Sequence, residues 1–379
     1  MESDENCERR HAIIIDNGSC FIKAGLSTEE TPKSHFRTCI GYPKNSEIYY
    51  KDYYIGNKLK GQMNELSLHY PIKEGSIQNW DEMEKIWNYI FYEELCVDDL
   101  SEYNIVLTQP IMNKKEEKEK MAQIMFESFN IPAIYIGYSV DLSFYSMGKL
   151  TGLSVDLGGE STQISAIFDG YPIPFQFERL YYGGNKITDY LFELFNFNSK
   201  MFYNDKNKCC VEDIKEKACN VALDYEEELK YLEFYEYTLP DNTNLIIKEE
   251  RIKATEAIFQ PLLIGKDKEM GLHYICNKII EKCGDKKNDI YNCICLSGGN
   301  SLFNGLSERL TKEIRAIVSE YYKENVRVNN PYGDARFSAF IGAIILSEIK
   351  TFNEILTTKE MYEEYGSSII YKKDPYIFK

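Results

Sequence analysis

Two short segments of the 379-residue sequence follow one pattern, and this repeat limits the possible folds more than any other feature. The first segment is the apolar run 12–15, followed by Asp16, a turn that contains glycine, and a second apolar stretch at 21–25. The second segment is the run 153–155, followed by Asp156, a turn with two glycines, and another β-rich stretch. Branched apolar residues on both sides of a glycine turn are typical of a β-hairpin. We therefore predict two hairpins, each with an aspartate at the end of its first strand.

The repeated hairpin indicates a chain folded as two similar lobes. Two copies of one unit this far apart favour lobes that face each other across a shared cleft, to which each lobe supplies one loop. A chain of 379 residues is also too long for one compact core. No proline-rich or glycine/serine-rich linker separates the lobes in the sequence, so we expect them to be interleaved.

Strands and helices alternate along the rest of the chain. Apolar residues in 80–90 recur with the three- and four-residue spacing of a helix, and a predicted strand at 105–108 ends before Pro110. A further strand, turn and helix are predicted within 293–310. This alternation places the chain in the α/β class.

Composition excludes several classes of function. The formal net charge of −16 opposes attraction of the whole surface to nucleic acid or anionic lipid, so a bound nucleotide needs a local site. The eleven cysteines are scattered without metal-binding spacings, which favours reduced thiols. The first residues are polar and acidic, and no apolar run approaches the ~18 residues of a membrane span. We expect a soluble, intracellular protein with no direct contact to nucleic acid and no membrane insertion.

The turns carry groups suited to a nucleotide. Successive backbone N–H groups in the first hairpin turn can converge on phosphate oxygens, and Ser19 and Lys23 add a hydroxyl and a positive charge. Two carboxylates, Asp16 and Asp156, can hold a hydrated Mg²⁺. The turn 297–301 offers a flat glycine surface at a helix start, where an adenine could stack. Each turn alone is more often an ordinary loop, but three in this order favour a nucleotide site.

Beyond these loops, the chain resembles the actin family over nearly its whole length. The segments that carry the resemblance are 70–72, 79–87, 119–127, 213–217, 259–261, 296–299 and 341–352. They distinguish the chain from sugar kinases and chaperone ATPases, which share only the three loops.

The resemblance implies an actin-like ATPase fold of two pseudo-symmetric lobes around a nucleotide cleft, with four subdomains. The expected subdomain 1 comprises 1–37, 68–146 and 338–379, and subdomain 2, with a shortened loop, comprises 38–67. Subdomain 3 comprises 147–182 and 267–337, and subdomain 4 comprises 183–266.

The resemblance also implies that ATP or ADP binds with Mg²⁺, which Asp16 and Asp156 would hold through water. The implied nucleotide contacts are Asp16, Gly18, Ser19, Cys20, Phe21, Lys23, Asp156, Gly158, Gly159, Glu160, Gly184, Lys215, Glu216, Gly298, Gly299, Leu302, Phe303 and Arg336. Without the resemblance, the pair Lys215 and Glu216 would be assigned to the solvated face of an amphipathic helix running from Ile214 to Tyr225.

Three positions depart from the family pattern. Ser139 stands where actin has a glutamine that orients the attacking water, and Gln163 replaces a histidine implicated in hydrolysis. Glu160 places an acidic side chain in the second phosphate loop, where its charge opposes a tight grip on phosphate. These departures predict ATP binding with weak or absent hydrolysis.

The resemblance further implies a groove that receives helices of actin-binding proteins. Its residues are Tyr145, Gly148, Leu150, Gly170, Tyr171, Leu346 and Ile349. The alternative for Leu346 and Ile349 is an ordinary place in the core of a helix. The tail 372–379 extends beyond the usual end of actin and could cover the groove.

The loop 44–53 is shorter by about four residues than the subunit-grasping loop at the same place in actin.

Three functions remain open at this level. The altered hydrolysis positions and the short loop favour a fixed, ATP-loaded subunit of an actin-related protein complex in the cytoskeleton, with other actin-like subunits as partners. A polymerising actin that hydrolyses ATP is the second candidate. A nuclear actin-related subunit of a chromatin-remodelling complex is the third.

Overall fold

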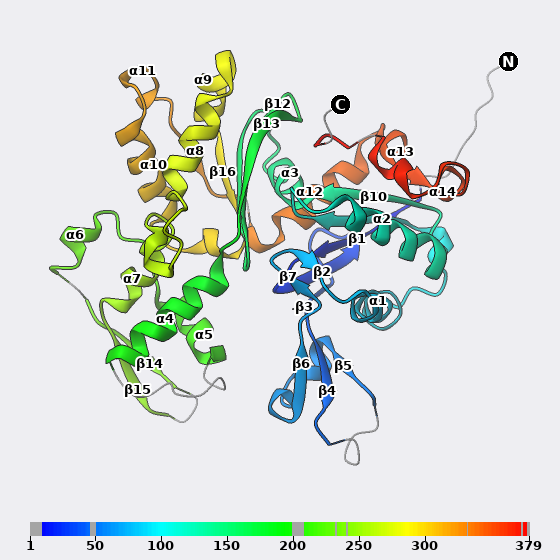
Figure 1. Ribbon diagram of the computed structural model, residues 1–379, viewed down its shortest axis with the longest axis horizontal. Coiled ribbons are helices and arrows are strands. Elements are labelled where there is room, and N and C mark those ends of the chain that lie inside the picture. Colours follow the sequence, from blue (N-terminus) through cyan, green and yellow to red (C-terminus); the bar gives the residue numbers. More distant parts are fainter. Residues whose placement is uncertain are drawn as a thin grey trace. The chain divides into compact units, whose positions relative to one another are not determined.

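The computed structural model describes residues 10–45, 51–198, 208–231, 233–239, 242–331, 333–372 and 374–376. The chain folds into two compact units (Figure 1). Unit 1 comprises Met1–Ser146 and Ala339–Lys379, and unit 2 comprises Met147–Ser338. The chain leaves unit 1 and returns to it, so the units are interleaved in the sequence as expected. The finer division into four subdomains stays a prediction.

Unit 1 is built on a six-stranded sheet with the order β18-β10-β9-β1-β2-β3. The strands are β1 (Ala12–Asn17), β2 (Phe21–Leu26), β3 (Ser34–Arg37), β9 (Asn104–Gln109), β10 (Ala133–Tyr138) and β18 (Thr357–Thr358). β1 and β2 form the predicted antiparallel hairpin, and β1, β9 and β10 run parallel. Smaller sheets contain β4 (Ile40–Pro43), β5 (Tyr54–Ile55) and β6 (Leu66–His69), and β7 (Ile72–Lys73) and β8 (Ser76–Ile77).

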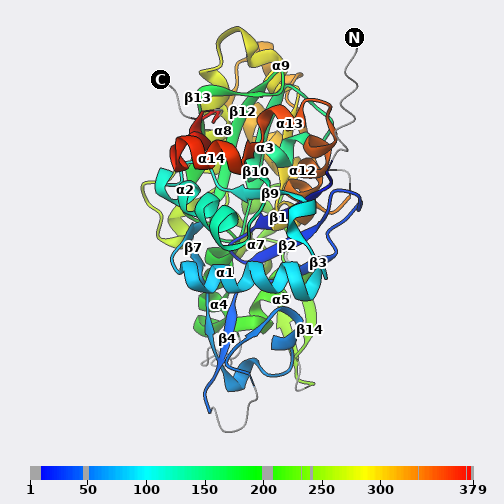
Figure 2. The ribbon, with the colours of Figure 1, turned by 90° about the vertical axis from the view of Figure 1, so that its right-hand side faces the viewer.

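Helices cover both faces of this sheet, which is why β1 is buried along its whole length. Ile13 and Ile15 pack in one core cluster with side chains of α1 (Trp80–Asn88) and α2 (Lys115–Gln123). Ile14 points to the other face and packs with α3 (Ser139–Tyr145) and α12 (Ser338–Glu348). Figure 2 looks onto unit 1, with α1, α2 and α14 (Lys359–Tyr365) in front of the sheet. α13 (Phe352–Ile355) is a further short α-helix of this unit.

Unit 2 is built on a five-stranded sheet with the order β13-β12-β11-β16-β17. The strands are β11 (Gly152–Leu157), β12 (Thr162–Phe168), β13 (Tyr171–Leu180), β16 (Ile294–Ser297) and β17 (Val328–Asn329), and a separate hairpin joins β14 (Tyr235–Thr238) to β15 (Asn244–Ile247). The helices are α4 (Gly184–Asn198), α5 (Lys208–Ala218), α6 (Tyr225–Glu228), α7 (Glu250–Glu256), α8 (Leu272–Glu281), α9 (Lys287–Tyr291), α10 (Leu306–Ile317) and α11 (Glu320–Lys323).

The two sheets share one topology, as the sequence repeat predicted. In each, a hairpin strand lies between its antiparallel partner and a parallel strand from much later in the chain. The register matches as well, because Asp16 pairs with Lys23 across the first hairpin and Asp156 pairs with Gln163 across the second. The repeat therefore covers five consecutive strands of each sheet, and β18 is an additional edge strand in unit 1.

One predicted helix is shorter than its apolar periodicity indicates. The helix expected from Ile214 to Tyr225 ends at Ala218, although Val221 remains buried. The backbone N–H groups of the next residues bond to other segments: Asn220 donates to the Arg251 carbonyl at 3.4 Å and Val221 to the Asn304 carbonyl at 2.8 Å. These tertiary bonds replace the helical ones, so the chain turns away and begins α6 at Tyr225.

Two further expectations concern the surface. The shortened loop 44–53 lies partly outside the described residues, and Tyr53 at its end packs, partly buried, against the core of unit 1. None of the helices in the described ranges is long and apolar enough to cross a membrane.

Candidate functional site

The first hairpin turn is organised around the buried carboxylate of Asp16. Lys23 Nζ contacts Asp16 Oδ2 at 2.8 Å, and the Thr108 hydroxyl donates to Asp16 Oδ1 at 2.7 Å. Asn17 donates its backbone N–H to Thr108 Oγ1 at 2.9 Å and accepts from Trp87 Nε1 at 3.1 Å. Thr108 and Trp87 were not among the predicted site residues. The signal for Thr108 was its place at the end of the predicted strand 105–108, which lies beside β1.

The tip of the first hairpin requires glycine at position 18. A Cβ there would lie 2.2 Å from the Phe21 carbonyl oxygen, so any side chain would force the turn open. The Gly18 carbonyl accepts a hydrogen bond from the Thr38 hydroxyl at 2.6 Å, and Thr38 N–H donates to the Cys20 carbonyl at 3.0 Å. The predicted residues 18–21 are half-buried, and the two hydrogen bonds from Thr38 stabilise their turn.

The second hairpin repeats this arrangement with different side chains. Gln163 is buried, and its Nε2 donates to Asp156 Oδ2 at 3.3 Å. Gln163 thus occupies the cross-strand place that Lys23 occupies in unit 1. The Gln163 amide is neutral, whereas the Lys23 ammonium is positively charged. The negative charge of Asp156 is therefore less compensated by its cross-strand neighbour than that of Asp16.

The turn after Asp156 packs directly against the start of α4. Gly184 donates its N–H to the Gly158 carbonyl at 3.1 Å, and Asn185 donates to the Gly159 carbonyl at 2.8 Å. A Cβ on Gly183 would lie 2.4 Å from the Gly158 carbonyl oxygen, so this close approach depends on glycine. The half-buried Glu160 belongs to the same turn.

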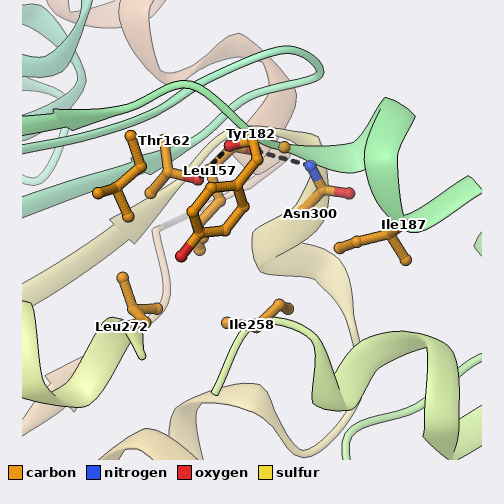
Figure 3. A pocket seen from close by; sticks show the side chains of 9 residues that line it. Leu157, Thr162, Tyr182, Ile187, Ile258, Leu272 and Asn300 are labelled. Carbon is orange, nitrogen blue, oxygen red and sulfur yellow. Dashed lines mark hydrogen bonds between the residues drawn. The ribbon is translucent and has the colours of Figure 1, made fainter. Parts of the chain in front are cut away.

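The third loop closes on the second. Gly298 has a φ of +81°, and a Cβ there would lie 2.6 Å from Asp156 Oδ1. Asn300 Nδ2 donates to the carbonyls of Gly158 at 2.7 Å and Leu157 at 3.2 Å. Figure 3 shows Asn300 joined to this strand end, beside a small, mainly apolar pocket. Asn300 was not a predicted site residue, because nothing in its neighbourhood along the chain indicates what its side chain bonds to.

The small pocket in Figure 3 lies in unit 2 and is lined in part by Leu157 and Asn300 of these two loops. Its lining residues are Leu157, Thr162, Leu180, Tyr182, Gly183, Ile187, Ile258, Leu272 and Asn300. The Tyr182 hydroxyl is buried and has no hydrogen-bond partner within the described ranges. Burial raises the pKa of Tyr182 well above its ordinary value, so the hydroxyl stays protonated.

Several of the predicted nucleotide contacts of unit 2 also lie together. Lys215 is only 6% exposed and donates from Nζ to the Gly184 carbonyl at 3.2 Å, so its assignment to a solvated helix face is wrong. Glu216 is exposed on the next position of α5. Hydrogen bonds to Asp334, with the Glu216 carboxylate nearby, raise the pKa of Arg336, and the Arg336 side chain also lies beside Gly299.

Two further predicted nucleotide contacts differ in exposure. Leu302 is half exposed, whereas Phe303 is buried in the core cluster of unit 2. Leu302 is therefore the one whose side chain is open to a ligand.

Comparison with known families agrees with this arrangement of loops. A family model described as Actin matches residues 7–375, which is nearly the whole chain. The chain belongs to the actin family. Actin-family proteins generally bind a nucleotide and a divalent metal, and the glycine turns and paired carboxylates of both units are groups suited to such ligands.

The donor chemistry of this actin-family chain suits a hydrated metal better than a dehydrated one. No group of three or more His, Cys, Asp or Glu side chains able to hold a metal occurs in the ranges that the structure describes. Asp16 and Asp156 are single carboxylates, one in each unit, and a single carboxylate can contact a Mg²⁺ ion that keeps most of its water shell.

Ser139, the first of the two predicted hydrolysis positions, is the first residue of α3. It follows Tyr138, the last residue of β10, whose side chain does not cap the helix. β10 is the parallel neighbour of β9, and Thr108, which bonds to Asp16, pairs with Gly137. Ser139 therefore follows the end of a strand that lies two strands away from β1 and the first hairpin turn.

The expected partner-groove residues divide between the units. In unit 1, Tyr145 and Leu346 pack partly buried against a core cluster, whereas Ile349 is 41% exposed and is not a core residue. In unit 2, Leu150 and Tyr171 are exposed by 62% and 74%. The adjacent glycines Gly148 and Gly170 both have positive φ, at 63° and 82°. Their role in binding partners stays a prediction.

Proposed function

We propose that this actin-family chain binds ATP or ADP with Mg²⁺ and keeps the nucleotide as a structural ligand, with weak or no hydrolysis. The observation that carries the proposal is the matched pair of aspartates, each at the end of a central strand and each followed by a turn with a sterically restricted glycine. A Cβ on Gly18 would lie 2.2 Å from the Phe21 carbonyl oxygen, and a Cβ on Gly158 would lie 2.9 Å from the Ser161 carbonyl oxygen. Asp16 and Asp156 would hold the hydrated Mg²⁺, which supplies charge neutralisation at the phosphates. Lys215, Glu216 and Arg336 would contact ribose and adenine.

The side chains at the two altered positions, Ser139 and Gln163, are poorly suited to hydrolysis. A glutamine amide such as that of Gln163 cannot take up a proton near pH 7, whereas an imidazole can. Its Nε2 is moreover engaged with Asp156. Ser139 carries a hydroxyl on a short side chain, which reaches less far toward a water than the glutamine of actin. A chain that keeps the phosphate turns but loses these groups is suited to holding ATP.

An equilibrium titration tests the binding step. Nucleotide-free protein titrated with ATP should bind one equivalent in the presence of Mg²⁺ and bind more weakly when EDTA removes the metal. Absence of binding under both conditions would contradict the proposal, and metal-independent binding would contradict the roles of Asp16 and Asp156.

For the cellular role we propose a fixed subunit of an actin-related protein complex in the cytoskeleton. Support comes from the altered hydrolysis positions and the short loop after β4. Affinity purification from native cells should recover a defined set of subunits at constant stoichiometry. Sedimentation of the purified chain as filaments in ATP and Mg²⁺ would instead favour a polymerising actin, and recovery with chromatin-remodelling subunits would favour the nuclear role.

A further inference from the structure

The segment 374–376 is bound into unit 1 through a buried carboxylate. Lys118 Nζ of α2 contacts Asp374 Oδ2 at 2.6 Å, and the side chains of both residues are almost fully buried. The Tyr138 hydroxyl donates to both Asp374 oxygens, at 2.9 and 2.7 Å. The backbone N–H of Tyr376 donates to Asp374 Oδ1 at 3.0 Å. Asp374 thus joins the tail to a helix and to the last residue of β10.

Tyr376 makes a second attachment on the other side of Ser139. Its hydroxyl donates to Asp141 Oδ1 in the first turn of α3 at 2.7 Å. Its ring packs edge-on against Tyr138, with ring centroids 4.5 Å apart. The tail therefore holds Tyr138 and Asp141, the residues that flank Ser139.

The burial of the Lys118–Asp374 ion pair makes detachment of the tail costly. An ion pair buried on both sides leaves an uncompensated charge when one partner departs, so the tail cannot detach without stranding the Lys118 ammonium in the interior. Burial lowers the pKa of Lys118, and the charge of Asp374 acts in the opposite direction because it stabilises the protonated ammonium. Asp374 and Tyr376 bind residues on both sides of Ser139, so the tail holds the start of α3 from two directions.

We propose that residues 374–376 form a latch that fixes the start of α3, and that Asp374 and Tyr376 are positioning residues for the site around Ser139. When the latch is intact, α3 begins in one place and bound nucleotide leaves slowly. When it is broken, the first turn of α3 opens more often and nucleotide leaves faster. This last step rests on the proposed nucleotide binding.

The variant Tyr376→Phe tests the latch in the full-length protein. It removes the hydroxyl that reaches Asp141 but keeps the ring that packs on Tyr138, so the chain should still fold. Ser367→Ala is the matched control, because Ser367 ties the same C-terminal region to Glu119 of α2 at 3.2 Å. Its hydroxyl bonds outside β10 and α3.

Two measurements keep the latch separate from the nucleotide. Hydrogen exchange of segment 136–146, followed in nucleotide-free protein, should become about tenfold faster in Tyr376→Phe and stay unchanged in Ser367→Ala. Release of a fluorescent ATP analogue from the loaded protein should accelerate severalfold in Tyr376→Phe alone.

Each outcome decides one part of the proposal. Unchanged exchange in Tyr376→Phe, or an equal rise in both variants, would overturn the latch. Faster exchange with unchanged analogue release would overturn the coupling to nucleotide while leaving the latch intact. If the wild-type protein binds no analogue, the proposed function fails, and the exchange data alone decide the latch.

Discussion

At the scale of single residues, Lys215 shows how burial changes the meaning of a charged side chain. It lies on α5 two positions before Lys217, yet Lys215 is buried against Gly184 whereas the Lys217 side chain is 59% exposed. A buried lysine bonded at the start of α4, beside the second hairpin turn, has a stronger claim to a ligand than a lysine in solvent.

Lys215→Met should therefore weaken ATP binding about tenfold, the equivalent of one charge-assisted hydrogen bond. Lys217→Met, which removes a surface ion pair with Asp213, should change the affinity less than twofold. Equal affinities for the two variants, measured by titration, would remove Lys215 from the site.

Glu160 gives a residue-scale prediction of opposite sign. Its carboxylate adds negative charge to the turn that would face phosphate, so Glu160→Gly should tighten ATP binding several-fold. The effect should shrink at high salt, because a Coulombic repulsion is screened. Unchanged affinity would show that the carboxylate points into solvent.

His273 gives a prediction about pH. It is 6% exposed, and burial lowers its pKa below the ordinary 6.5, so the folded protein resists protonation that the unfolded chain accepts. The unfolded state then binds more protons, and stability is present above pH 6.5 and is lost as the pH falls through the lowered value. Urea unfolding at pH 7 and 5 should show this loss, and His273→Gln should reduce it.

At the scale of elements, α10 depends on one buried ion pair. Arg309 meets the Glu256 carboxylate with two contacts of 3.1 Å and also donates to the Ala222 carbonyl at 2.7 Å. Arg309→Met strands Glu256 and should cost about 3–5 kcal/mol of unfolding free energy. Lys312→Met, on the same helix, removes an exposed pair with Asp224 and should cost less than about 1 kcal/mol. Denaturant unfolding that gives similar costs for both would contradict this account of α10.

The elements also show why some features were predictable from sequence. The two hairpins, the strand β9 and the helix α1 follow from local apolar spacing and turn residues, and the structure confirms them. The end of α5 at Ala218 and the bond from Asn300 to Gly158 depend on partners far along the chain. Local spacing carries no information about such partners, so a continuous helix was the wrong prediction there.

At the scale of the whole molecule, the nucleotide should stabilise the fold by mass action. ATP with Mg²⁺ at about 100 times its dissociation constant should raise the free energy of unfolding by about 2.7 kcal/mol. Thermal unfolding should then shift upward by a few degrees, and chelation of Mg²⁺ should reverse the shift. No shift on loading would mean that the nucleotide binds folded and unfolded chains equally or does not bind.

The central claim is that the chain holds ATP without cycling it, and a single-turnover experiment tests this most directly. Protein loaded with γ-phosphate-labelled ATP and Mg²⁺ is freed of excess nucleotide, and the bound label is followed over hours. We predict that most bound nucleotide remains ATP and that little labelled phosphate is released. Complete conversion to ADP at the rate of an actin control would contradict the claim.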